Sequence, residues 1–245
     1  MIAGMAVSKG ERVGGLDGAL VRLGEVLAGV EVNVGDGYCG YCYAESDAVA
    51  LSGPLGWIAA DLIPAVAAEV PDHWGDFAGL YRKLTPRIMA LLVYDELHVD
   101  EELIAERIAE AGCWQSWADV ERDAMLDVCR AWWDATLSAY PRRPQAHEVL
   151  SFLVTTPVPL TQWFDVLNSQ PPGPADMHAL ELCQSWAPEL IGTDLTLGWS
   201  STINVTTDVK RWILEDAKPR LARVPEDVRL TEVLAILESG DWPSG

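Results

Sequence analysis

The sequence predicts an all-α protein, an irregular antiparallel helical bundle or HEAT-like array of about nine or ten helices. Three observations support this prediction. Apolar residues recur at intervals of three and four along most of the 245 residues, capping residues and prolines punctuate these runs, and strand-like alternation occurs once. Because no repeat of fixed period is visible, a regular solenoid is not expected.

The chain changes its hydrophobic period near residue 30. Leucines recur at three and four residues over 16–28, which predicts a helix that Gly29 ends. Valines then alternate with polar residues over 30–34, the pattern of a half-buried strand. A Gly-Asp-Gly turn at 35–37 leads into a short non-helical N-terminal CxxC segment, and a short helix is expected at 44–51.

Two later helix starts carry capping signals. Thr85 and Pro86 have the residue types of an N-cap and first helical position, where proline loses no hydrogen bond. Asp100 is expected to cap the next helix, which Gly112 ends. Ser116, followed three residues later by an acidic residue, resembles a capping box and should open the longest helix.

The remaining helices follow from apolar periodicity between proline-rich connections. They are expected at 58–70, 145–154, 160–168, 175–190, 207–216 and 226–238. Because these connections are short, neighbouring helices should pair antiparallel within a single helical domain, 1–245. The linker at 171–174 marks where a subdomain boundary would fall.

The charge balance argues against polyanionic partners. The chain has 37 acidic and 17 basic residues and a formal net charge of −20. That field repels phosphate groups, and Lys and Arg do not cluster, so we expect neither nucleic acid nor membrane as a partner. A basic protein partner fits the charge, and so does a purely solubilising role. None of these features indicates a particular oligomeric state.

Cysteine use and hydropathy predict a cytoplasmic protein. Five cysteines without the spacing of a disulfide framework indicate a reducing compartment. The N-terminal segment is interrupted by charges and lacks the apolar core of a secretory signal. The longest apolar stretch, 57–70, is broken by Asp61 and Pro64 and is too short for a membrane span.

Cys39 and Cys42 form the one motif with a clear chemical meaning. Two thiolates at this spacing supply half of a tetrahedral zinc site from a tight turn. His73 and His98 lie on downstream connections between helices, so both are expected to complete a Cys2His2 structural zinc site. Cys113, in a loop, is an alternative to either histidine.

The same motif supports a redox interpretation. Cys39-Gly40-Tyr41-Cys42 resembles the active-site tetrapeptide of bacterial disulfide isomerases, which have a thioredoxin-like fold. In that resemblance Thr156-Pro157 matches the cis-proline segment, and the implied activity is thiol–disulfide exchange. The residues after Pro157 are nevertheless expected to be helical. A third interpretation, two ordinary small residues at a packed turn, also stays open.

No other group of residues points to catalysis. Cys129 and Cys183 fall on apolar helix positions and are expected as core thiols, while His147 and His178 are expected as ordinary helix residues. GxSxG, Walker A, GxGxxG and HExxH motifs are absent from the sequence.

The sequence therefore favours a non-enzymatic adaptor, regulator or immunity-type protein that binds another protein. The 11 tryptophans fit this interpretation if a few lie at a contact surface. A thiol–disulfide or metal-dependent enzyme using Cys39 and Cys42 is the alternative.

Overall fold

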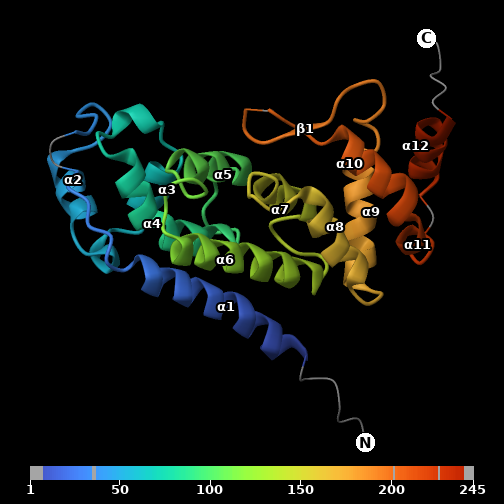
Figure 1. The fold of residues 1–245 in the computed structure, drawn as a ribbon, viewed down its shortest axis with the longest axis horizontal. Helices are drawn as coiled ribbons and strands as arrows, with labels where there is room; N and C mark the ends of the chain where they lie inside the picture. The colour runs from blue at the N-terminus through green and yellow to red at the C-terminus, as the bar shows by residue number, and fades with distance from the viewer. Residues whose placement is uncertain (1–7, 35–36, 201, 226, 240–245) are drawn as a thin grey trace, which may run out of the picture. The chain divides into compact units, whose positions relative to one another are not determined.

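The computed structural model describes residues 8–34, 37–200, 202–225 and 227–239 (Figure 1). Within these residues the chain forms twelve α-helices and one small sheet, which confirms the all-α class. The chain divides into two compact units, Met1–Trp132 and Trp133–Gly245. The single-domain assignment and the boundary near 171–174 stay predictions.

The first unit is organised around helix α4. Its helices are α1 (Ser8–Leu27), α2 (Glu45–Ser52), α3 (Leu62–Ala67), α4 (Phe77–Leu92), α5 (Glu101–Glu110) and the first part of α6 (Asp119–Leu137). Short 3-10 turns precede two of them, η1 (Leu55–Trp57) before α3 and η2 (Pro71–His73) before α4. Because α1, α3 and α5 all pack on α4, most of its residues are buried.

Helix α4 corrects the predicted start at Thr85-Pro86. The helix begins at Phe77, where the Asp76 side chain accepts a hydrogen bond from the Gly79 N–H at 2.9 Å. Pro86 lies inside the helix and costs it one intrahelical hydrogen bond. Burial on several sides outweighs that loss, so tertiary packing overrides the local capping signal.

The ends of α5 and α6 agree with the sequence in part: Asp100 occupies the N-cap position of α5, but its side chain makes no capping hydrogen bond. Gly112 adopts a left-handed conformation, with φ of 81°, directly after α5, as expected of a helix stop. The hydrogen bond that opens α6 lies two residues later than the predicted capping box: the Ala118 N–H donates to Glu121 Oε2 at 3.0 Å, and alanine has no side-chain acceptor to complete a box.

The second unit is also helical. It contains α7 (Ala146–Leu153), α8 (Leu160–Ser169), α9 (Pro174–Trp186), α10 (Thr206–Arg211), α11 (Lys218–Leu221) and α12 (Val228–Ser239). Helices α7, α8 and α11 pack on α9, and a π-helical turn, Trp212–Asp216, follows α10. The 171–174 linker leads directly into α9.

The strand predicted over 30–34 does not form, and the observed strands lie elsewhere in the chain. The described sheet pairs β1 (Thr196–Leu197) antiparallel with β2 (Ile203–Asn204), strands too short to show alternation in the sequence. Residues 30–34 form no ladder with other described residues. The alternation of apolar and polar residues arises because Val32 and Val34 are buried while Glu31 and Asn33 are exposed. The first two residues of the predicted turn, Gly35 and Asp36, lie outside the described residues.

No helix in the described part of the chain combines the length and apolar character that a bilayer crossing requires.

Candidate metal centre

Two loops of the first unit meet through their backbones. Tyr38 and Trp74 form an isolated antiparallel bridge, and the Cys39 N–H donates to the His73 carbonyl at 2.9 Å. The first loop carries the CxxC motif, and the second is the turn η2 between α3 and α4. This pairing brings His73 beside the two cysteines.

Two glycines allow the loops to approach this closely. The Gly75 N–H donates to the Gly37 carbonyl at 2.5 Å. A Cβ on Gly37 would lie 2.9 Å from Gly75 Cα, and one on Gly75 would lie 3.1 Å from Gly37 Cα. A side chain at Gly37 would force the two loops apart, and one at Gly75 would require the neighbouring loop to shift by a few tenths of an ångström.

The ligand atoms of Cys39, Cys42 and His73 converge. The two Sγ atoms are 3.5 Å apart, Cys42 Sγ is 3.6 Å from His73 Nδ1, and all three atoms lie within 4.8 Å of one another. Tetrahedral zinc bonds would separate two sulfurs by about 3.8 Å and a sulfur from a nitrogen by about 3.6 Å. The group therefore has the spacing that could hold a metal ion.

The tight turn at the CxxC motif makes its two thiols unequal. The Cys42 and Tyr43 N–H groups donate to the Cys39 carbonyl at 3.1 and 3.0 Å. Backbone amides of Cys42 and Tyr41 hydrogen-bond to the Cys39 sulfur and lower its pKa, and the contact with the Cys42 thiol adds to this. The same sulfur–sulfur hydrogen bond raises the pKa of Cys42, with desolvation as a further cause.

Glu69 adds a carboxylate that the sequence did not reveal. Its Oε1 lies 3.1 Å from His73 Nδ1, the nitrogen that also faces Cys42, and accepts the Val70 N–H at 3.0 Å. Its Oε2 accepts the Tyr43 hydroxyl at 3.1 Å. Burial opposes ionisation of Glu69, but these hydrogen bonds outweigh it and lower its pKa. An acid four residues before a loop histidine is the signal that could have identified it.

His98 does not belong to this group of ligand atoms. It lies between α4 and α5, is exposed and has a positive φ of 55°. In the described part of the chain, the converging atoms are those of Cys39, Cys42 and His73. The role predicted for His98 as a zinc ligand stays a prediction.

The other cysteines lie in the helical core. Cys113, Cys129 and Cys183 are fully buried, which confirms the core assignment of the last two. Burial raises the pKa of Cys129 and of Cys183 to about 12, and it raises that of Cys113 as well. His178 is buried too, with Nε2 2.9 Å from the Ala139 carbonyl.

Comparisons with protein-family models, curated proteins and solved structures find no match to this chain. The local resemblance to disulfide isomerases does not extend along the chain either, because the residues after Pro157 form α8. The described residues contain one sheet, of two short strands, and it lies far along the chain from the CxxC motif. The candidate site is therefore interpreted from its own geometry.

Proposed function

We propose that a zinc ion bound by Cys39, Cys42 and His73 fastens the CxxC loop to the 69–75 loop of a helical, protein-binding protein. The spacing of the three ligand atoms is the observation that carries this proposal. Thiolate and imidazole donors favour zinc over magnesium or calcium, which prefer oxygen. The ion would add to the backbone hydrogen bonds that already join the two loops.

We propose Glu69 as the fourth ligand, in place of the His98 ligand expected from the sequence. An ion at His73 Nδ1 would displace the proton between that nitrogen and Glu69, leaving Oε1 next to the ion. Glu69→Gln should weaken zinc binding at least about tenfold, whereas His98→Asn should leave it unchanged. The reverse pattern would assign the fourth position to His98.

Metal analysis of protein purified without a histidine tag tests the zinc proposal. One zinc per chain is expected, and Cys42→Ser should abolish binding. Tyr41→Ser is the matched control, because this side chain in the same turn is 98% exposed. Metal-free protein that takes up no added zinc, and whose Cys39 and Cys42 thiols stay reactive, would contradict the proposal.

The protein-binding part of the proposal is an adaptor, regulator or immunity-type role toward a basic protein in the cytoplasm. The net charge of −20 supports a basic target. Trp57, on the turn η1, is 83% exposed, and exposed tryptophans often dominate binding energy at interfaces. A bundle or HEAT-like arrangement of the helices is part of the same proposal.

A pull-down followed by affinity measurement tests this role. The affinity for the captured partner should fall as salt rises and should drop at least about tenfold in Trp57→Ala. Val49→Ala is a suitable control, since Val49 is also exposed, at 66%. A salt-independent partner, or none, would contradict the proposal.

Thiol–disulfide exchange is the second candidate function. It is supported by the 3.5 Å separation of the sulfurs and by the lowered pKa of Cys39. This function predicts a reversible Cys39–Cys42 disulfide and reduction of insulin by the dithiol protein in the presence of dithiothreitol. A silent redox couple in zinc-free protein would exclude it.

A further inference from the structure

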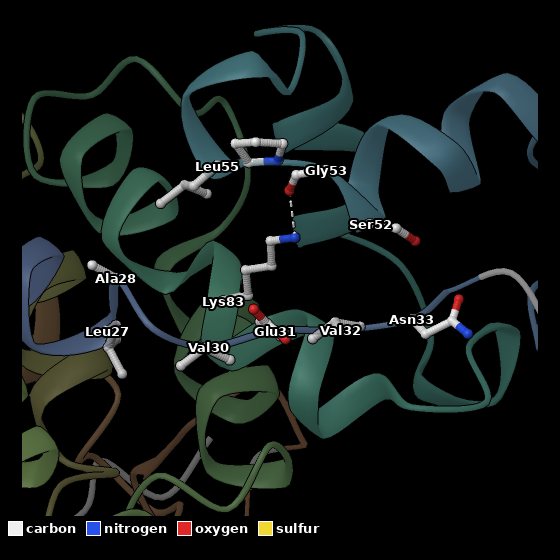
Figure 2. A pocket seen from close by; sticks show the side chains of 11 residues that line it. Leu27, Ala28, Val30, Glu31, Val32, Asn33, Ser52, Gly53, Leu55 and Lys83 are labelled. Carbon is white, nitrogen blue, oxygen red and sulfur yellow. Dashed lines mark hydrogen bonds between the residues drawn. The ribbon is translucent and has the colours of Figure 1, made fainter.

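A pocket of about 640 Å³ opens in the first unit, away from the cysteine cluster (Figure 2). Its walls come from the end of α1 and the segment 30–33, from the end of α2 and the loop that follows it, and from Lys83 of α4. Val30, Val32 and Leu55 make part of the wall apolar. Figure 2 shows the Lys83 side chain extending across the pocket from the side of segment 30–34 toward Gly53.

Lys83 is an unusual residue for such a wall. It is only 5% exposed, and its Nζ donates to the carbonyls of Leu51 and Gly53 at 2.8 and 2.6 Å. These carbonyls lie at the C-terminal end of α2, where a cation is favoured. Two of the three ammonium protons are thus used, and no carboxylate of the described residues lies within ion-pair distance. Buried lysines usually have such a partner.

The extended segment turns a backbone edge toward the same pocket. The Val34 N–H donates to Ser52 Oγ at 3.0 Å, which fixes the edge that faces the end of α2. In an extended chain, residues two apart direct their backbone groups to the same side, so those of Val32 would point, like the Val34 N–H, toward the side of Ser52, which lines the pocket. Neither the N–H nor the C=O of Val32 has a hydrogen-bond partner among the described residues.

We propose that this pocket binds an extended peptide segment of a partner protein, which pairs with Val32 and places one carboxylate on Lys83. The inference rests on the protein-binding part of the proposed function and is independent of the metal centre. Main-chain pairing would supply affinity, and the apolar walls and the ammonium group would supply specificity. Glu31 is the acidic residue of the lining, so the residues flanking that carboxylate should be neutral or basic.

Selection from a phage-displayed library of random heptapeptides, with the full chain as bait, tests the inference. The enriched peptides should share one Asp or Glu, and a synthetic copy should bind in a fluorescence-polarisation assay. Replacing that acid by its amide should weaken binding at least about tenfold, because a charge-assisted hydrogen bond is lost. This comparison needs no protein variant, so it does not depend on whether α4 tolerates substitution.

Protein variants then locate the contact. Lys83→Met should lose the preference for acid over amide, and Glu31→Gln should tighten binding of the acidic peptide about two- to threefold. The Val32 amide should become protected from hydrogen exchange when the peptide binds. No acidic consensus, equal binding of acid and amide, or an unprotected Val32 would overturn the inference. If the pull-down still yields a salt-sensitive partner, the proposed function stands without it.

Discussion

Two polar sites, one in each unit, differ in how their charges are satisfied. In the second unit Asp176 and Arg220 are both nearly inaccessible, and Arg220 Nη1 donates to Asp176 Oδ1 at 2.7 Å. Arg220 Nη2 also donates to the carbonyls of Asn168 and Gln170 at 2.7 and 2.6 Å. In the first unit the two thiols of the CxxC motif and the His73 imidazole converge, and the Glu69 carboxylate lies against that imidazole.

This difference indicates that the Asp176–Arg220 pair is structural, whereas the group around Cys39 and Cys42 is suited to binding a ligand. A buried ion pair whose donors and acceptors are all matched within the protein needs nothing further. Converging electron-pair donors repel one another once deprotonated and become stable when a cation joins them. The predictions below separate the two cases.

The largest effect is expected at the buried ion pair. Asp176→Ala leaves the Arg220 charge buried without its carboxylate and should lower the free energy of unfolding by about 3–5 kcal/mol. Urea denaturation measures it. Asp165→Ala, an exposed position on α8, should change stability by less than about 0.5 kcal/mol. Equal effects would show that the Arg220 network is not structural.

Zinc should stabilise the wild-type chain by binding to Cys39, Cys42 and His73. At a free concentration a hundredfold above Kd, a bound ion adds about 2.7 kcal/mol and raises Tm. Cys42→Ser should remove this zinc-dependent rise in Tm, because a ligand is lost. Asp176→Ala should keep the rise while starting from a lower Tm. Thermal denaturation with zinc and with chelator distinguishes these outcomes.

Disturbing the contact between Gly37 and Gly75 should weaken metal binding more than it destabilises the helical core. Gly75→Ala places a Cβ 3.1 Å from Gly37 Cα and should weaken zinc binding by about tenfold through displaced loops. Gly40→Ala is the control, since nothing lies within 4 Å of its added Cβ. Competition with a chromophoric chelator measures both affinities. Equal affinities would show that the loop contact does not position the ligands.

The smallest effect is expected in the reactivity of the zinc-free thiols. Because its pKa is lowered, Cys39 should be alkylated by iodoacetamide a few-fold faster than Cys42 near pH 7. The difference should narrow as pH rises and Cys42 also ionises. Cys129 and Cys183, with pKa values of about 12, serve as unreactive controls in the same peptide maps. Faster alkylation of Cys42 would contradict the assigned hydrogen bonding.

Local pattern predicted much of the fold because most helices follow their own apolar periodicity. The residues of α5 and α8 show this, and so does the Gly112 stop. Thr85-Pro86 misled because burial of α4 on several sides outweighs one lost hydrogen bond. The two-residue strands β1 and β2 were missed because they are too short for a period to show.

The candidate site was predicted only in part, because the contact between its two loops is not visible in the local sequence pattern. Residue type and spacing identified Cys39 and Cys42, and loop placement added His73. Glu69 joins them through the pairing of two loops, a long-range contact made possible by Gly37 and Gly75. Sequence spacing does not show that the two loops meet, so only the four-residue interval from Glu69 to His73 could have pointed to this carboxylate.

X-ray absorption spectroscopy of the zinc-loaded, untagged chain tests the central claim most directly. The account predicts two sulfur scatterers at about 2.3 Å and two nitrogen or oxygen scatterers at about 2.0–2.2 Å from the ion. Loss of one sulfur in Cys42→Ser would identify the ligands. A shell without sulfur, or an ion with only oxygen ligands, would contradict the assignment of Cys39 and Cys42 as a metal centre.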